Sequence, residues 1–261
     1  MARTSKPLRS DISWSSSEKI TIRGLDMPTE ILGHMDIGEL SFLQITGQRP
    51  TKDQARVYNA MIVALIEHGL TPSAIAARLT YTGAPESMQA AIAAGICGLG
   101  TVFVGSMEGA AKMLTDALPF DTPQEVELTK LAERIVADFR DTGKIIPGLG
   151  HPIHKQIDPR APRLLEIARE TRTSGRYVEL VQLIAAEAAR VSGKPLPLNA
   201  TGVIGALCCE LQFPWQVVRG FGVMARAIGL VGHLAEERVK PIAPEIWRRT
   251  EEEATQHVRP D

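Results

Sequence analysis

Residues 145–164, IIPGLGHPIHKQIDPRAPRL, combine two histidines and three cationic side chains in a segment that holds four prolines. Each proline fixes its own φ, so the backbone around His151 is restricted and the imidazole is held in place. An imidazole changes charge near neutral pH, which suits it to proton transfer. Together with Arg160 it indicates a site that binds an anion and moves a proton. A surface loop with an incidental histidine is the alternative that these residues leave open.

Arg160 is expected in the first turn of a helix. Asp158 has the residue type of an N-cap, and Pro159 suits the first helical position. The guanidinium would then lie beside the positive end of the helix dipole. A carboxylate that approaches there meets a bidentate cation and backbone N–H donors. The pattern therefore predicts a carboxylate-binding site at this helix end.

The elements that position these groups are predicted to be helices, because apolar residues recur at three- and four-residue steps along nearly the whole chain. One helix is expected to start at Thr51–Asp53 and to stop at Gly69, and another follows from Val126 to Gly143. Further helices are expected at about 161–172, 176–191, 200–211 and 215–238. Alternation is confined to KITIRG, residues 19–24, which predicts a short strand or hairpin. The fold class is therefore all-α.

The amino-acid composition and the net charge limit the kinds of molecule that the protein is expected to bind. The chain has 261 residues and a net charge of −1, with 44% hydrophobic and 23% charged residues, which is ordinary for a globular protein and argues against disorder. A charge so close to zero gives no electrostatic case for a nucleic-acid or anionic-membrane partner. The first residues lack the apolar stretch of a secretory signal. Three cysteines, two of them adjacent at Cys208 and Cys209, are expected to be reduced and buried in a cytoplasmic protein.

The segment between Glu86 and Glu108 contains no charged residue and is long enough to cross a bilayer. Alanine and glycine dominate it, however, and Gly95, Gly98 and Gly100 interrupt it. We expect two short, closely packed interior helices here and no membrane span. No pair of His, Asp, Glu or Cys has the spacing of a zinc site, so no metal ion is predicted.

Several blocks of the sequence resemble one enzyme family. GLGHPIHKQIDPRA, residues 148–161, resembles the G-x-G-H-x₆-D-P-R-A loop of the citrate synthase superfamily. The other blocks follow in the family's order: ITIRG at 20–24, ELSFLQITGQRPT at 39–51, IEHGLTPSAIAARL at 66–79, GSMEGAAKML at 105–114, PLNATGVIGAL at 197–207 and ARAIGLVGHLAEER at 225–238. The motifs GHPIHK and GHLAEER are most similar to those of stand-alone citryl-CoA lyases. The C-terminal lyase domain of ATP-citrate lyases is related to these enzymes.

The resemblance implies an all-α, citrate synthase-like fold with a large domain, residues 1–113 and 213–261, and an inserted small domain, residues 114–212. A cleft between the two would bind an acyl-CoA and a di- or tricarboxylate. The resemblance also implies a homodimer or a higher homo-oligomer, with a coenzyme A thioester as substrate and no tightly bound cofactor. Neither nucleic acid nor a membrane is expected as a partner.

The resemblance also assigns roles to residues that match the family's motifs. His151 matches a histidine that acts as acid and base at the hydroxyl or keto oxygen of the substrate. His68, Arg160 and Arg226 match substrate-binding positions. A third substrate arginine has no clear match, and Arg238 and Lys240 are the candidates. The part of the loop that lies against CoA corresponds to Ile146, Pro147, Gly148, Leu149, Gly150 and Lys155.

Two catalytic positions depart from the family pattern. Glu108 stands where the family has its first catalytic histidine, and Thr201 stands where it has an aspartate. A threonine does not replace a carboxylate as general base at neutral pH. We interpret Glu108 as the group that exchanges a proton with the acetyl α-carbon, aided by a pKa raised in uncharged surroundings. Thr201 would donate a hydrogen bond to the thioester oxygen. The alternative for Glu108 is a partner of its own helix dipole.

Three functions are open at this point. The first is cleavage of a hydroxy-acyl-CoA, such as citryl-CoA, to acetyl-CoA and a 2-keto acid such as oxaloacetate. The second is a condensation of the citrate synthase or methylcitrate synthase type, since the two directions share one equilibrium. The third is a non-catalytic homologue that binds acyl-CoA, which the missing aspartate supports. The sequence favours the lyase.

Overall fold

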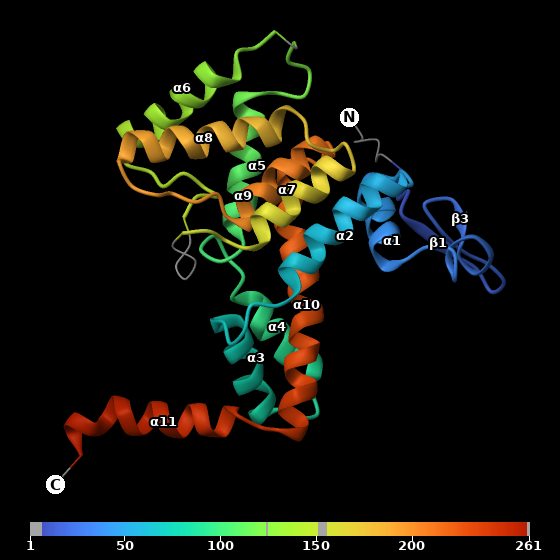
Figure 1. Ribbon diagram of the computed structural model, residues 1–261. Coiled ribbons are helices and arrows are strands. Elements are labelled where there is room, and N and C mark those ends of the chain that lie inside the picture. The colour runs from blue at the N-terminus through green and yellow to red at the C-terminus, as the bar shows by residue number, and fades with distance from the viewer. Residues whose placement is uncertain (1–6, 124, 151–155, 260–261) are drawn as a thin grey trace, which may run out of the picture. The chain divides into compact units, whose positions relative to one another are not determined.

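A computed structural model describes residues 7–123, 125–150 and 156–259 of the chain (Figure 1). Helices make up most of these residues, and the all-α class predicted from the sequence is confirmed. By its internal contacts the chain divides into two compact units, Met1–Asn59 and Ala60–Asp261, and the division falls inside helix α2 (Lys52–Ile66). The predicted large domain (1–113 with 213–261) and small domain (114–212) stay a prediction.

The first unit begins with a small antiparallel sheet of β1 (Ser13–Ser15), β2 (Ile20–Ile22) and β3 (Leu25–Asp26), in that order. Arg23 and Gly24 connect β2 to β3 with φ of 50° and 83°, and positive φ at both central residues matches the twist of a tight hairpin. The strand or hairpin predicted at 19–24 is therefore confirmed. A π-helix (Met27–Ile31) and α1 (Ile37–Thr46) follow.

The starts of α1 and α2 are fixed by reciprocal side-chain caps. Asp36 accepts the backbone N–H of Glu39 at 2.7 Å, and the Glu39 carboxylate accepts the N–H of Asp36 at 2.9 Å. Thr51 and Gln54 exchange the equivalent bonds at 3.2 and 2.9 Å, which confirms the predicted start of α2. The helix ends at Ile66, three residues before the predicted stop at Gly69, whose φ of 76° suits glycine.

The second unit consists of the C-terminal part of α2 and the helices after it. These are α3 (Pro72–Gly83), α4 (Met88–Cys97), α5 (Gly105–Ala117), α6 (Leu128–Asp141), α7 (Arg160–Glu170), α8 (Arg176–Ser192), α9 (Ala200–Glu210), α10 (Trp215–Val239) and α11 (Ala243–Thr255), with a 3₁₀ turn at Gln256–Val258. Helix α10 packs on α3, α4, α5 and α9, and α9 also packs on α5, α7 and α8. The last four predicted helices are confirmed to within two residues at each end.

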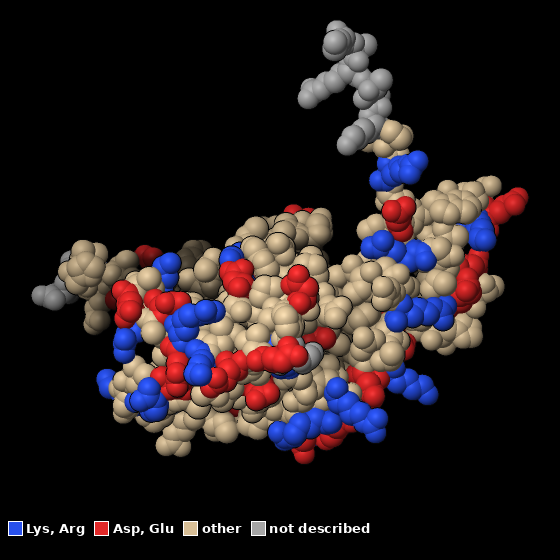
Figure 2. All heavy atoms as spheres, turned by 90° about the horizontal axis from the view of Figure 1, so that it is seen from above, with Lys and Arg blue, Asp and Glu red and all other residues tan. Residues whose placement is uncertain are grey.

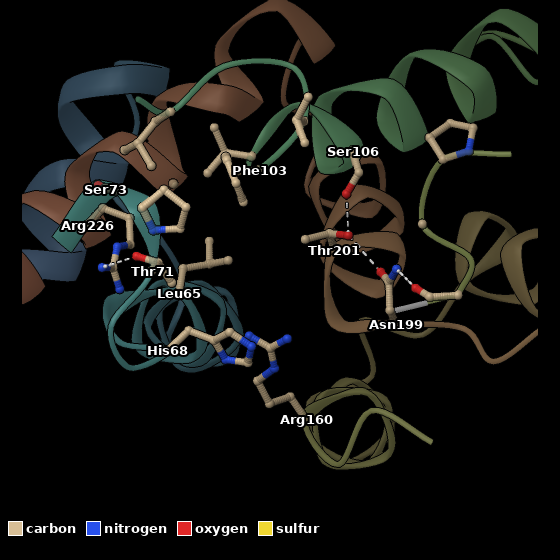
Figure 3. A pocket seen from close by; sticks show the side chains of 18 of the residues that line it. Leu65, His68, Thr71, Ser73, Phe103, Ser106, Arg160, Asn199, Thr201 and Arg226 are labelled. Carbon is tan, nitrogen blue, oxygen red and sulfur yellow. Dashed lines mark hydrogen bonds between the residues drawn. The ribbon is translucent and has the colours of Figure 1, made fainter. Parts of the chain in front are cut away.

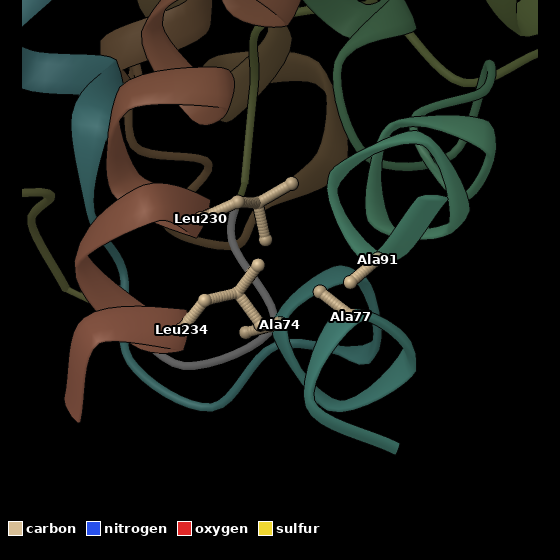
Figure 4. Packing of buried hydrophobic residues seen from close by; sticks show 5 residues of the cluster. All are labelled: Ala74, Ala77, Ala91, Leu230 and Leu234. Atoms are coloured by element: carbon tan, nitrogen blue, oxygen red, sulfur yellow. The ribbon is translucent and has the colours of Figure 1, made fainter. Parts of the chain in front are cut away.

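Small residues let these helices approach closely. A methyl group on Gly205 of α9 would lie 2.8 Å from Cβ of Ala110 and 2.9 Å from the carbonyl oxygen of Met107, both on α5. A methyl group on Gly95 of α4 would lie 2.7 Å from a methyl carbon of Leu230 on α10. The core between α3, α4 and α10 is formed by Ala74, Ala77, Ala91, Leu230 and Leu234 (Figure 4). Alanine and glycine thus set the spacing of the helices around α10.

The uncharged segment folds into α4 and the first turn of α5, and both helices pack on α10. Cys208 and Cys209 are buried, as predicted. The prediction is wrong for Cys97, which is exposed because it is the last residue of α4, where the helix ends at the surface.

Helix α10 has the composition of a core helix. Among the described residues it is the one helix whose length and mean hydropathy, 1.3, would allow it to cross a membrane. Buried helices of globular proteins have the same composition. Its contacts with four other helices account for its apolar character.

Candidate active site

A cavity of about 830 Å³ in the second unit gathers residues that are far apart in the sequence (Figure 3). Its wall is formed by the segment between α2 and α3, the residues before α5, the loop at 145–150, the first turns of α7 and α9, and α10. The structure brings together, in this wall, the predicted residues 146–150, His68, Arg160, Thr201 and Arg226.

Apolar side chains make up much of the cavity wall. Leu65, Leu99, Phe103, Ile146 and Leu149 are among them. A concave apolar surface with a small number of placed polar groups is typical of a small-molecule site. The cavity is therefore suited to a ligand with an apolar part and a few charged groups.

Arg160 is held by a carboxylate two residues before it. Its Nε and Nη2 donate to the two oxygens of Asp158 at 3.0 and 2.9 Å, and its Nη1 donates to the carbonyl oxygen of Ala64 on α2 at 3.3 Å. The helix starts at Arg160, as expected, but Pro159 occupies the N-cap position. Asp158 still satisfies a backbone donor at this helix end, because its side chain accepts the N–H of Arg160 at 3.1 Å. The guanidinium is therefore fixed in the cavity wall.

Asp158 is completely buried. One of its oxygens also accepts the backbone N–H of Ala200, at the start of α9, at 2.9 Å. Burial opposes the charge, but the hydrogen bonds from the Arg160 guanidinium and from the Ala200 N–H outweigh it and lower the pKa of Asp158 to about 2. This carboxylate joins the starts of α7 and α9 and orients Arg160.

Arg226 reaches the cavity from α10 and is almost fully buried. Its Nη1 donates to the carbonyl oxygen of Ile66 at 2.9 Å. Its Nη2 donates to Oγ1 of Thr71 at 3.4 Å, a bond drawn in Figure 3. The carboxylate of Glu67 lies 3.6 Å from Nη1. The arginine is therefore anchored to the segment that joins α2 to α3.

Glu67 is the one carboxylate among the described residues that line the cavity. Its Oε1 accepts the N–H groups of His68 and Gly69 at 2.8 and 2.7 Å and lies 3.1 Å from Nε2 of His233. Partial burial opposes the charge, but these hydrogen bonds and the nearby Arg226 outweigh it, so the pKa of Glu67 is lowered. A carboxylate in this state is a weak proton acceptor, and we interpret it as a structural anion.

The first turn of α9 is joined to the loop at 145–150. Asn199 is the N-cap of α9: its Oδ1 accepts the N–H of Gly202 at 3.0 Å, and its Nδ2 donates to the carbonyl oxygen of Gly150 at 2.6 Å. Its own N–H donates to the carbonyl oxygen of Gly148 at 3.0 Å. Gly148 has a φ of 88°, and a methyl group on Gly202 would lie 2.5 Å from the Gly148 oxygen. Glycine is therefore required at both positions.

Thr201 lies at the centre of a short chain of hydroxyl groups. Its Oγ1 donates to Oδ1 of Asn199 at 2.6 Å, and Oγ of Ser106, in the first turn of α5, lies 2.6 Å from the same Oγ1 (Figure 3). A hydroxyl group has one proton. The predicted donation from Thr201 to a thioester oxygen therefore requires its bond to Asn199 to break.

Glu108 lies in the first turn of α5 but is not one of the described residues that line the cavity. Its carboxylate accepts a charge-assisted hydrogen bond from Nε of Arg219 on α10. The uncharged surroundings expected from the sequence are wrong, because Arg219 approaches from a helix more than a hundred residues away in the chain. The role of Glu108 in proton exchange stays a prediction.

Residues 23–250 match the citrate synthase C-terminal domain family. The chain belongs to this family. A citryl-CoA lyase from Hydrogenobacter thermophilus has a similar structure, with 32% identity and a TM-score of 0.80, over 89% of this chain and 87% of that one. An ATP citrate lyase from Methanosaeta concilii, solved with (3S)-citryl-CoA, shares the fold with 22% identity and a TM-score of 0.72, over 91% of this chain and 40% of that one.

Two relatives of this chain are longer proteins. ATP-citrate synthase subunit 1 of Sordaria macrospora is 23% identical over 249 residues, which is 88% of this chain and 35% of the relative. Citrate synthase 2 of Bacillus subtilis is 24% identical over 217 residues, which is 82% of this chain and 55% of the relative. The chain thus spans between a third and about half of the length of these two relatives.

Some residues predicted from the family pattern are not placed at the cavity. Arg238 and Lys240 are exposed at the end of α10 and are not among the described residues that line the cavity. His151 and Lys155 lie outside the described residues. Within the described ranges, no three His, Cys, Asp or Glu side chains gather as a metal ion requires. The homo-oligomer and the cytoplasmic location stay predictions.

Sequence reasoning missed Glu67, Ser106 and Asn199 as cavity residues. For Asn199 a signal existed, because asparagine before an apolar helical run is a typical N-cap. Glu67 and Ser106 carry no such signal. Their roles depend on Arg226 and Thr201, which are distant in the sequence and meet them only in the folded chain.

Proposed function

We propose that the protein cleaves a hydroxy-acyl-CoA, citryl-CoA or an analogue, to acetyl-CoA and a 2-keto acid such as oxaloacetate. The observation that carries this proposal is that the guanidinium groups of Arg160 and Arg226 line one largely apolar cavity. An acidic thioester needs cations for its carboxylates and an apolar wall for its acyl part. Similarity to a citryl-CoA lyase, 32% identical over 89% of this chain, supports cleavage of this substrate class.

Both arginines are oriented before a substrate arrives. Asp158 and the Ala64 carbonyl oxygen hold Arg160, and the Ile66 carbonyl oxygen holds Arg226. A side chain fixed in this way loses little conformational freedom when it binds a carboxylate, so more of the interaction contributes to affinity. The two carboxylate contacts would fix the acid half of the substrate relative to the thioester.

The proposed cleavage has two steps, the breaking of a carbon–carbon bond and the protonation of the enolate that this releases. A base removes the proton of the substrate hydroxyl group, the O–H electron pair forms the keto C=O, and the adjacent carbon–carbon bond breaks toward the thioester α-carbon. The resulting enolate takes up one proton and becomes acetyl-CoA. We propose His151 as the base, because it directly follows Gly150 in the loop that reaches the cavity.

Glu108 can be tested with a matched pair of variants. If its carboxylate exchanges the proton of the acetyl α-carbon, Glu108→Gln is expected to lower turnover by about 10² to 10⁴. Arg219→Gln breaks the same ion pair but leaves the carboxylate, so it is expected to retain most of the turnover. Equal losses of turnover in the two variants would mean that the ion pair, and not the carboxylate itself, is needed for activity. Unchanged turnover of Glu108→Gln on every active thioester would reject the role.

Incubation with a panel of hydroxy-acyl-CoA thioesters, followed by detection of 2-keto acid release, tests the proposed activity. Assays of acetyl-CoA with each 2-keto acid test the condensation direction. His151→Ala is expected to lose turnover in both directions, because the group that takes the hydroxyl proton in cleavage returns it in condensation. Cleavage of none of the thioesters, together with condensation by the same preparation, would replace the lyase by a synthase.

A non-catalytic acyl-CoA-binding homologue is the second candidate function. It is favoured by Thr201 at the position of the family's aspartate, and by the fixed, hydrogen-bonded state of Glu67 in the cavity. Such a protein would be thermally stabilised by CoA but show no turnover. It would also incorporate no deuterium from heavy water into acetyl-CoA, whereas an enzyme that forms the enolate would.

A further inference from the structure

The amide group of Asn199 has one possible orientation. Its Nδ2 faces the carbonyl oxygen of Gly150 at 2.6 Å, an atom that only accepts, and its Oδ1 faces the N–H of Gly202 at 3.0 Å, a group that only donates. The two contacts agree, so nitrogen and oxygen are assigned by their partners. Asn199 is 8% exposed, which keeps water from competing for these bonds. Its Oδ1 is therefore a pure acceptor.

This orientation sets the direction of the hydroxyl chain. Thr201 lies 2.6 Å from Oδ1 of Asn199 and must donate its single proton there. Ser106 lies 2.6 Å from Oγ1 of Thr201, and since Thr201 has no further proton, Ser106 is the donor of that bond. Both protons therefore point along the chain toward Asn199. What Ser106 can still offer to the cavity is the lone pairs of its Oγ.

We propose that Oγ of Ser106 is a hydrogen-bond acceptor that recognises an O–H or N–H group of the ligand. Ser106 lines the cavity, and its remaining hydrogen-bonding capacity disfavours a carbonyl, carboxylate or enolate oxygen at the same place. The inference rests on the proposed function for the identity of the ligand. A hydroxy-acyl-CoA offers two such donors. One is the hydroxyl group of the acid half, whose single proton would turn from Ser106 to the base in the cleavage step; the other is the amide N–H groups of the pantetheine arm.

The acceptor role also has a consequence for the relative affinities of substrate and product. A 2-keto acid carries a C=O where the hydroxy-acyl thioester carries an O–H. If Ser106 contacts the acid half, the cavity favours the hydroxy compound over its keto product. The hydrogen-bond chain from Ser106 through Thr201 to Asn199 would then select a ligand with a hydroxyl group, and it would not donate to an oxyanion.

The experiment measures binding of citrate, tricarballylate and CoA by calorimetry. Tricarballylate is citrate with hydrogen in place of the hydroxyl group, so the two acids differ in one donor. The wild-type protein is expected to bind citrate roughly threefold to tenfold more tightly, the effect of one net hydrogen bond. Ser106→Ala is expected to reduce this ratio to about one. Ser174→Ala, at an exposed serine outside the cavity, is the matched control and is expected to keep the ratio.

The CoA measurement distinguishes the two sources of the donor. If the donor is a pantetheine N–H, Ser106→Ala lowers the affinity for CoA by a similar factor, and the ratio of the two acids does not change. Thr201→Val adds a second variant: it removes the acceptor of the Ser106 proton and lets Ser106 donate. Its affinity for oxaloacetate, whose keto oxygen only accepts, is expected to rise by roughly threefold to tenfold.

A wild-type ratio near one, together with unchanged CoA affinity in Ser106→Ala, would overturn the inference. Binding of citrate and CoA in the same experiment would leave the proposed function intact. The comparison of the two acids on the wild-type protein needs no variant, so a folding defect of Ser106→Ala cannot obscure it. Failure of all three ligands to bind would overturn both the inference and the proposed function.

Discussion

At the scale of single residues, burial decides what an ion pair contributes to stability. The pKa values of Asp158 and Glu245 are both lowered to about 2. At Asp158 burial opposes the charge, and the hydrogen bonds from Arg160 outweigh it. At Glu245 the hydrogen bonds from Arg248 and Arg249 lower the pKa. The Asp158 side chain is completely buried, whereas that of Glu245 on α11 is 42% exposed. Water and salt screen the exposed pair, and loss of one partner from a buried pair leaves an uncompensated charge. The same pKa therefore has different consequences at the two positions.

Asp158→Asn is expected to lower the free energy of unfolding by about 2 kcal/mol at neutral pH, the order that a pKa shift from 3.8 to about 2 implies. The folded-state pKa lies below that of the unfolded chain. The contribution is therefore present above about pH 4 and is lost as the pH falls toward about 2. Urea unfolding at a series of pH values should show a constant difference between wild type and variant near neutrality, and a shrinking one below about pH 4.

Glu245→Gln is the matched control for this prediction, because it removes a carboxylate with the same pKa from an exposed helix. Its effect on unfolding should be clearly smaller than that of Asp158→Asn. Equal losses in the two variants would contradict the role assigned to burial. A difference between wild type and Asp158→Asn that did not change with pH would show that the loss comes from packing and not from the charge.

At the scale of elements, the contact between α9 and the loop at 145–150 depends on a glycine pair. Gly202→Ala would place a methyl group 2.5 Å from the Gly148 carbonyl oxygen and 2.7 Å from Cδ1 of Leu198. We expect a loss of about 1 to 3 kcal/mol in unfolding free energy, because the loop must move away from α9. Gly220→Ala, on an exposed part of α10 with no atom within 4 Å, should instead stabilise the protein by up to about 1 kcal/mol.

Thermal unfolding of the two glycine variants checks this prediction, and citrate binding measures whether the loop still forms the cavity. Gly202→Ala should lose both stability and affinity, since the loop supplies part of the cavity wall. If both variants shifted the unfolding temperature in the same direction, the close approach of the two backbones would not be the cause.

Arg78 joins three helices through a buried ion pair. From α3 its Nη1 donates to Glu237 of α10 at 2.6 Å, and its Nε lies 3.1 Å from Nδ1 of His233. The other oxygen of Glu237 accepts the N–H groups of Ile242 and Ala243 at the start of α11, at 2.9 and 2.8 Å. One carboxylate thus connects α3, α10 and α11.

Arg78→Met is expected to lower the free energy of unfolding by about 3 to 5 kcal/mol, because it leaves the carboxylate of Glu237 buried without its cation. Arg163→Met, which breaks an exposed pair with Glu166 on α7, should have a much smaller effect, because water screens that pair. Urea unfolding compares the two. A loss in Arg78→Met as small as that in Arg163→Met would mean that water replaces the arginine at Glu237.

The sequence predicts helix ends to within a few residues, because these depend on neighbouring residues, but not the ion pairs that form between helices distant in the chain. Thr51 marks the start of α2 correctly, because a cap depends on a few neighbouring residues, whereas the helix ends at Ile66, three residues before the predicted stop at Gly69. Arg160 and Arg226 were found through motifs, and the structure places both in one cavity wall. The ion pair of Glu108 with Arg219 was not predictable, since it joins α5 to α10 and no spacing along the chain encodes it.

At the scale of the whole molecule, charge is balanced, so the proposed anion binding would be a local property of the cavity. The net charge is −1, and acidic and basic side chains are interspersed on the face shown in Figure 2. Such a surface does not attract anions over long distances. In the proposed function, affinity for a carboxylate would therefore come from Arg160 and Arg226 in the cavity, and added salt should weaken it less than it weakens binding to an exposed basic surface.

Ligand-induced stabilisation tests this localisation. At about 100 times its dissociation constant, citrate is expected to raise the free energy of unfolding by about 2.7 kcal/mol, which corresponds to roughly 5 to 10 °C in a chain of this size. Arg226→Gln should lose most of this shift but keep that caused by CoA, because its guanidinium contacts only the acid half in the proposed complex. Each variant is compared with and without ligand by differential scanning calorimetry, so an intrinsic change in stability cancels.

Arg248→Gln is the matched control for this measurement. It removes an arginine of the same charge from exposed pairs on α11, and citrate should stabilise it as it does the wild-type protein. Full stabilisation of Arg226→Gln by citrate would place the acid elsewhere on the protein. A citrate shift lost in both variants would make net charge the cause, and the cavity would then have no special part in binding the acid.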